Sequence, residues 1–115
     1  RAEKKTKDNS KIHINLAINY GSKIEITNAI KALNKKKIKI SPHNLEKFLY
    51  TKGIPDPDIL IRTGNTKRLS NFLLWQLSYS EIFFEKKLWP DFKISDFDKI
   101  ITEYNNIKRN YGSIT

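Results

Sequence analysis

The sequence predicts an α/β fold with a mainly parallel sheet flanked by helices. Residues 12–19 alternate branched apolar residues with small or polar ones, which is the period of a β-strand. A second apolar run, residues 59–61, follows after two segments with helical patterns. The order strand, helix, helix, strand is typical of a crossover connection. We therefore expect the two strands to lie parallel and to be buried on both faces.

Length and composition favour one folded domain. A chain of 115 residues is long enough for one core but not for two. Hydrophobic residues make up 38% and aromatic residues 11%, which excludes a disordered composition. Cysteine is absent, so a disulfide framework and a thiolate metal site are excluded, and a cytoplasmic location is expected. No apolar run approaches the ~18 residues of a membrane span, and the start has no signal-peptide pattern.

The formal net charge of +10 indicates attraction toward anions. Diphosphates, nucleic acid and an anionic membrane face are all candidates, and a lysine-rich solvated surface is the simpler interpretation. The basic run of residues 35–37 is too short to indicate nucleic-acid binding by itself. Charge alone therefore does not select a partner.

The first part of the chain is expected to be a loop followed by a strand. Residues 1–11 are polar, and because residue 1 is Arg rather than Met, we expect the sequence to be a piece of a longer protein. In the strand of residues 12–19, every second side chain lies on one face. That face carries Ile12, Ile14, Leu16 and Ile18.

Two helices are predicted next. Ser22 and Glu25 have the spacing of a capping box, and the helix they begin runs to about residue 35. Its buried face comprises Ile26, Ala29, Ile30 and Leu33. Ser41 and Pro42 suit the N-cap and first position of a second helix, which ends before Gly53. The apolar stripe of this helix comprises Leu45, Phe48 and Leu49.

After the strand of residues 59–61 we expect a helix, a strand and a final helix. Ser70 and Asn71 can cap a helix of residues 72–79, and residues 82–84 are interpreted as a strand. Ser95 can cap the last helix, with Asp98 at its third position and Asp96 complementing its dipole. This helix is expected to end at residue 112. Its apolar face comprises Phe97, Ile100, Ile101, Tyr104, Ile107 and Tyr111.

The loop after residues 59–61 is a candidate anion site. Arg62 ends the strand, and Arg68 and Ser70 follow in a loop that contains a glycine. In open α/β sheets, ligands bind beyond the carboxyl ends of strands. The two guanidinium groups offer permanent charge, Ser70 offers a hydroxyl, and the loop offers backbone N–H groups. The alternative is that both arginines form ordinary surface ion pairs.

Residues 58–81 read DILIRTGNTKRLSNFLLWQLSYSE, and LWPDF follows at 88–92. This string resembles the C-terminal signature of the cis-prenyltransferases, the undecaprenyl diphosphate synthase family, D-L-x-I-R-T-[SG]-G-E-x-R-[LI]-S-N-F-L-L-W-Q-x-x-Y-[SA]-E. Residues 17–21, AINYG, are similar to the family's A-x-N-Y-G, and residues 109–112 to its R-R-F-G. The resemblance implies that residues 1–115 are the C-terminal portion of a single cis-prenyltransferase domain. The N-terminal half with the family's D-G-N-x-R motif is missing.

The resemblance implies a prenyltransferase that condenses isopentenyl diphosphate onto an allylic diphosphate. Its product would be an undecaprenyl-type diphosphate for lipid-carrier and cell-wall synthesis. Arg62, Arg68 and Ser70 would hold the diphosphate of the isopentenyl substrate, with backbone contact from Leu69. Glu81 matches the family's Mg²⁺ ligand. The catalytic Asp lies in the missing half, so this segment contains no catalytic residue.

The resemblance also implies a homodimer in the cytoplasm, with transient contact at the membrane surface. The region of residues 72–79 takes part in the family's dimer interface. The strand of residues 12–18 would line the tunnel for the growing chain.

The sequence departs from the family pattern in two places. Ser22 and Lys23 replace a Gly and an Arg, and Asn65 and Thr66 replace a Gly and a Glu. Asn tolerates positive φ, so we expect the loop to form, although it lacks the carboxylate. With half of the active site missing, we expect the chain alone to bind isopentenyl diphosphate weakly at most and not to turn over.

Two other functions are compatible with the residues. One is a non-catalytic family member, or inactive fragment, that supports an active partner. The other is a basic nucleic-acid-binding module. No recognition motif of that class is present, so we rank it last and expect no nucleic-acid partner.

Overall fold

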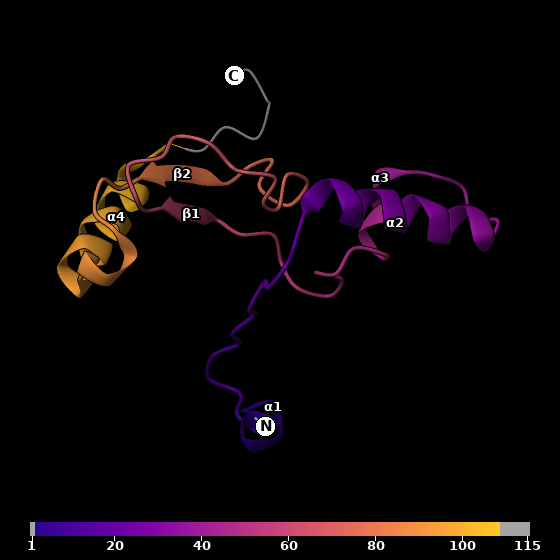
Figure 1. Ribbon diagram of the computed structural model, residues 1–115, viewed down its shortest axis with the longest axis horizontal. Coiled ribbons are helices and arrows are strands. Elements are labelled where there is room, and N and C mark those ends of the chain that lie inside the picture. Colours follow the sequence, from indigo (N-terminus) through magenta and orange to yellow (C-terminus); the bar gives the residue numbers. More distant parts are fainter. Residues whose placement is uncertain (1, 109–115) are drawn as a thin grey trace.

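The computed structural model describes residues 2–108. Figure 1 shows two lobes joined by a loop segment, with the amino-terminal tail leading away from both. The elements are α1 (Ala2–Thr6), α2 (Ser22–Lys35), α3 (Pro42–Glu46), β1 (Ile59–Arg62), β2 (Glu81–Phe84), the 3₁₀ turn η1 (Trp89–Asp91) and α4 (Ile94–Asn106). This is the expected α/β arrangement.

The helical lobe consists of α2, α3 and the turns that follow α3. The predicted apolar faces of these helices meet, and the buried core comprises Ala29, Leu33, Leu45 and Leu49. Ser41 caps α3 as predicted, because its Oγ accepts a hydrogen bond from the Asn44 N–H at 3.2 Å. The helix is shorter than expected, since it ends at Glu46 and gives way to turns before Gly53.

The sheet lobe contains β1, β2 and α4 (Figure 1). β1 and β2 are parallel, with Ile59 opposite Glu81 and Arg62 opposite Phe84. The strands predicted at residues 59–61 and 82–84 and a parallel sheet are therefore confirmed. The parallel pairing predicted between residues 12–19 and 59–61 is wrong, and so is burial on both faces. All β1 residues are only partly buried, and β2 residues alternate between partly buried and exposed. Within residues 2–108, no further strand covers the sheet edges.

The strand predicted for residues 12–19 is absent, and that prediction is wrong for this structure. The segment has no regular secondary structure, and Ile12, Ile14, Leu16 and Ile18 are 75–84% exposed. A strand is stable only when its N–H and C=O groups pair with a neighbour. No strand among the described residues offers that pairing, so the period-2 pattern has no partner.

The helix predicted for residues 72–79 is also wrong. The segment forms a series of turns. Ser70, Asn71 and Leu73 have φ of 50°, 62° and 43°, which are left-handed values that a right-handed helix excludes. The turns instead connect the lobes: Trp75 packs against the helical core, and the Ser80 hydroxyl donates to the Pro57 carbonyl at 2.5 Å.

The ends of the chain also differ from prediction. The opening residues form α1 rather than a loop, since Ala, Glu and Lys favour helix, and none of its residues is buried. α4 begins at Ile94 rather than after Ser95, with Asp96 at its third position. It ends at Asn106 because Ile107 has extended backbone angles, so the predicted end at residue 112 is wrong. Tyr111, Gly112 and the R-R-F-G resemblance lie outside the described residues.

The predicted capping box at the start of α2 is wrong, although the helix bounds are right. Gly21 is the N-cap, and Ser22 and Glu25 do not cap their own helix. Both side chains are buried and bind other segments. The Glu25 carboxylate accepts from the Tyr20 hydroxyl, from the Tyr50 N–H at 2.7 Å and from the Gln76 side-chain amide at 3.3 Å. A residue that was expected to serve its own helix thus ties three segments together.

Candidate functional site

Arg62 lies at the carboxyl end of β1, where the sequence placed it. Its backbone carbonyl accepts a hydrogen bond from the Glu85 N–H at 2.8 Å. Its Nε is buried and has no hydrogen-bond partner among the described residues. A buried charged donor without an acceptor is costly, because its lost hydration is not replaced. An unpaired guanidinium N–H of this kind can donate a charge-assisted hydrogen bond to a bound anion.

The loop after Arg62 is anchored at its start to the segment after β2. The Gly64 N–H donates to the Lys87 carbonyl at 2.7 Å, and the Asn65 N–H donates to the Glu85 carbonyl at 3.1 Å. Gly64 and Asn65 have φ of 87° and 53°. The expectation that Asn65 can adopt positive φ is confirmed. The two N–H groups are engaged within the protein, so they do not face a ligand.

The loop is anchored at its other end to α2. The Asn71 carbonyl accepts from the Ser22 N–H at 2.8 Å, and its side-chain Oδ1 accepts from the Lys23 N–H at 2.9 Å. Between the two anchors, residues 66–71 donate no backbone hydrogen bond to any residue from 2 to 108. These N–H groups remain available beside Arg68 and Ser70.

Arg62, Arg68 and Ser70 share this short stretch, but no hydrogen bond joins their side chains. Arg68 and Ser70 are exposed, Arg62 is partly buried, and none forms an ion pair with a described residue. Leu69 is partly buried, and its carbonyl accepts from the Phe72 N–H at 3.0 Å. A surface cavity beside α3, lined by His43, Glu46 and Asp56 among others, includes none of these four residues.

Glu81 lies at the opposite end of the sheet from Arg62. It is the first residue of β2 and pairs with Ile59, and its N–H donates to the Asp58 carbonyl at 2.9 Å. Ile59, which pairs with Glu81, lies three residues before Arg62 along β1, and this is a distance of about 10 Å at ~3.3 Å per residue. The backbone of this chain therefore does not bring Glu81 and Arg62 to one point.

Glu81 offers a single carboxylate to a metal ion. Across residues 2–108 there is no group of three or more His, Cys, Asp or Glu that could hold one. Mg²⁺ takes one or two carboxylates from protein and completes its shell with water and phosphate oxygens. A lone, partly buried Glu81 fits that requirement as one of two protein ligands.

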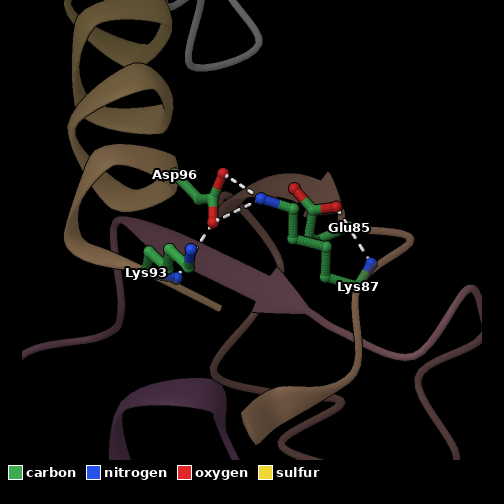
Figure 2. Close-up of polar contacts among 4 residues, drawn as sticks. All are labelled: Glu85, Lys87, Lys93 and Asp96. Carbon is green, nitrogen blue, oxygen red and sulfur yellow. Dashed lines mark hydrogen bonds and ion pairs between the residues drawn. The ribbon is translucent and has the colours of Figure 1, made fainter. Parts of the chain in front are cut away.

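An ion pair braces the segment that anchors the loop. Figure 2 shows Lys87 reaching the first turn of α4, where its Nζ lies 2.7 and 2.8 Å from the two carboxylate oxygens of Asp96. Asp96 Oδ2 also accepts from the Lys93 N–H at 2.9 Å. The hydrogen bond from Lys87, followed by that from Lys93, lowers the pKa of Asp96, and the same Lys87–Asp96 bond raises the pKa of Lys87.

Sequence reasoning missed the residues that position the loop. Lys87 was given no role, and Asp96 was expected only to complement the dipole of the last helix; the two residues are nine apart. Asn71 was expected to cap a helix of its own. The signal that could have indicated its partner was Gly21, which leaves α2 without a side chain at the N-cap.

The parallel strands place the Arg- and Ser-containing loop at their carboxyl edge, where open α/β sheets bind their ligands. Comparison with known proteins defines the class as prenyltransferase. The family profile Prenyltransf, of undecaprenyl diphosphate synthase, matches residues 1–112, and the chain belongs to that family.

Curated relatives share more than two fifths of the sequence. The isoprenyl transferases of Oceanobacillus iheyensis and Thermotoga maritima are 46% and 43% identical over 98% and 97% of this chain. These matches cover 48% and 50% of the two relatives, so the chain spans about half the length of the curated relatives it matches.

Solved structures agree with the fold. A Campylobacter jejuni protein described as a probable undecaprenyl diphosphate synthase superposes with a TM-score of 0.87 at 43% identity, covering 96% of this chain and 52% of that chain. Lavandulyl diphosphate synthase from Lavandula x intermedia, solved with dimethylallyl diphosphate, gives 0.88 at 36% identity, with coverage of 97% and 51%. The fold is that of part of a cis-prenyltransferase.

Proposed function

We propose that the chain is the C-terminal half of a cis-prenyltransferase domain, and that its loop binds the diphosphate of isopentenyl diphosphate. The orphaned, buried Nε of Arg62 is the observation that carries this proposal. Arg68, Ser70 and the unpaired N–H groups of residues 66–71 complete the donor set, with Leu69 contributing its backbone. A diphosphate substrate is supported by the curated relatives, which are named isoprenyl transferases, and by the similar lavandulyl diphosphate synthase, which was solved with dimethylallyl diphosphate.

The whole protein would extend an allylic diphosphate with isopentenyl units to a polyprenyl diphosphate of the undecaprenyl type. This product serves lipid-carrier and cell-wall synthesis. Loss of diphosphate from the allylic substrate develops negative charge, and fixed cationic donors stabilise that charge. The missing N-terminal half would supply the D-G-N-x-R motif and its catalytic Asp. The family's working form would be a cytoplasmic homodimer that touches the membrane surface transiently.

Glu81 would be this chain's ligand to Mg²⁺, together with an Asp from the N-terminal half. The ion, when bound, supplies positive charge to diphosphate oxygens.

A binding experiment tests the clamp on the chain itself. We expect isopentenyl diphosphate to shift the amide resonances of residues 66–71 in an NMR titration, with weak affinity and without turnover. Arg62→Ala and Arg68→Ala should each weaken binding about ten- to hundredfold, because a hydrogen bond to a charged group contributes about 1.5–3 kcal/mol.

The same variants test the reaction in a chimaeric enzyme. This chain would replace the matching half of the Oceanobacillus iheyensis isoprenyl transferase, and the KM for isopentenyl diphosphate would be measured. Lys86→Ala is the matched control, since it removes an equal charge from an exposed residue outside the loop. A rise of less than about twofold for both arginine variants would remove them from the clamp.

A non-catalytic role in support of an active partner is the second candidate. It is favoured by Thr66, which stands where the family has a Glu and instead donates its hydroxyl to the Gly64 carbonyl at 3.2 Å. A chimaera that stays inactive while the chain raises the activity of an intact relative would select this role.

A further inference from the structure

The N-terminus of α2 is capped by a residue from a distant segment. Gly21, the N-cap, has no side chain to accept the first helical N–H groups. Asn71 supplies both acceptors: its carbonyl binds the Ser22 N–H at 2.8 Å, and its Oδ1 binds the Lys23 N–H at 2.9 Å. A return bond runs from the Leu74 N–H to the buried Ser22 Oγ at 3.0 Å. One asparagine thus replaces a local cap across 48 residues of sequence.

The glycine at residue 21 leaves space for the Asn71 amide group. A Cβ at residue 21 would lie 2.9 Å from the Asn71 Nδ2, which is closer than real Cβ contacts. Its φ of −150° is open to any residue, so the backbone does not demand glycine there. The glycine of the A-x-N-Y-G string therefore makes room for the asparagine that follows Ser70.

Asn71 also fixes a strained turn beside the candidate diphosphate donors. Ser70 and Asn71 have consecutive positive φ values of 50° and 62°. A left-handed backbone costs free energy for a serine, and such a conformation persists only when the surrounding structure holds it in place. The three bonds between residues 71–74 and α2 supply that restraint, while Gly64 and Asn65 hold the other end of the loop.

We propose that Asn71 is a positioning residue, which locks the loop carrying Arg68 and Ser70 to the N-terminus of α2 through a contact that a side chain at residue 21 would crowd. Its consequence for ligand affinity rests on the proposed function. The lock itself is a property of the free protein.

The first experiment measures the lock without ligand. NMR order parameters of residues 66–70 and the melting temperature are compared for the wild-type chain and for Asn71→Ala. We expect both to fall in the variant. Lys31→Gly is the control: it weakens α2 by about 1 kcal/mol at an exposed site away from the cap, and the loop should stay ordered. Loss of loop order in Lys31→Gly equal to that in Asn71→Ala would overturn the proposal.

A double variant separates positioning from helix stability. In Gly21→Ser/Asn71→Ala, the new serine can cap α2 locally, because residue 21 has the extended backbone of an N-cap. The melting temperature should partly recover while residues 66–70 remain loose. Recovery of loop order together with the melting temperature would show that Asn71 is merely structural.

A mutant cycle tests the contact itself, and its Gly21→Ala arm remains informative if Asn71→Ala folds poorly. Gly21→Ala should disorder the loop by displacing Asn71, yet have no further effect in an Asn71→Ala background. Additive effects would overturn the contact.

The consequence for binding is read from the dissociation constant for isopentenyl diphosphate, which should rise at least fivefold in Asn71→Ala. An unchanged constant, with Arg68→Ala weakening binding, would overturn only the positioning role in binding. An unchanged constant in Arg68→Ala as well would overturn the proposed clamp, while the ligand-free data still decide the lock.

Discussion

At the scale of single residues, polar side chains in this protein bind segments far from their own. Glu25 joins Tyr20, Tyr50 and Gln76, and the last of these also donates to the Thr51 hydroxyl at 3.0 Å. Burial, followed by the hydrogen bond to Glu25, raises the pKa of the Tyr20 hydroxyl to about 12. Tyr20 therefore stays protonated, and remains a donor, in alkaline solution where an exposed tyrosine ionises.

This shift predicts a loss of stability at high pH. Below pH ~10 Tyr20 is protonated in both the folded and unfolded chain; from about 10 to about 12 only the unfolded chain releases the proton, which favours unfolding. In denaturant titrations, the free energy of unfolding of the wild type should exceed that of Tyr20→Phe, and this difference should shrink as the pH rises from about 10 to about 12. The exposed Tyr79→Phe serves as control. If the difference in free energy of unfolding stayed constant from neutral pH to pH ~12, the raised pKa of Tyr20 would be contradicted.

At the scale of elements, the sheet lobe depends on the bond between the segment after β2 and the start of α4. Asp96 is buried there, accepts from Lys87 and Lys93, and occupies the helix N-terminus, where negative charge is favourable (Figure 2). The backbone carbonyls of Glu85 and Lys87 hold the start of the loop after Arg62. The ion pair thus braces the same segment that anchors the candidate site.

We predict that Asp96→Asn lowers the melting temperature near pH 7 and has little effect in strong acid. The folded pKa of Asp96 lies below its ordinary value of 3.8, so its contribution is present above that value and is lost as the pH falls through the folded pKa. Melting curves from about pH 2 to about pH 7 would measure this. Asp98→Asn, on the exposed side of α4, is the control. A deficit that persists undiminished in acid would refute the ion-pair explanation.

At the scale of the whole molecule, the chain is expanded for its length. The radius of gyration is 16.9 Å, whereas a compact domain of this size has about 13 Å. In one lobe α2 packs against α3, and in the other β1 pairs with β2. The segment of residues 12–19 leads away from both lobes (Figure 1), and its apolar side chains are exposed. The chain spans about half of its curated relatives, so we infer that the remaining half covers these surfaces.

Hydrogen exchange tests this inference. The N–H groups of residues 12–19 make no hydrogen bond to the described chain, so they should exchange at nearly unprotected rates, whereas the interior of α2 is protected. In the chimaera with the Oceanobacillus iheyensis protein, residues 12–19 should become protected by pairing with a strand of the added half. Rapid exchange in an active chimaera would show that this segment is not a strand of the complete fold.

The sequence by itself determined those features that depend on local periodicity and turn chemistry. α2 and the two short strands follow from the spacing of apolar residues, the start of α3 follows from Ser41 and Pro42, and the string at residues 58–81 indicated the family. Of the apolar face expected for α4, Ile100 is buried, whereas Phe97 is 44% exposed. Asn65 with positive φ was also predictable, because asparagine tolerates that conformation better than most residues.

Only the tertiary structure decided which groups pair across the chain. The exposure of residues 12–19, the left-handed turn at Ser70 and Asn71, and the trans cap on α2 depend on the presence or absence of a partner far away in sequence. The separation of Arg62 from Glu81 likewise depends on strand register. Local pattern fixes what a segment can form, but its hydrogen bonds need a neighbour, and the neighbour's position is a property of the fold.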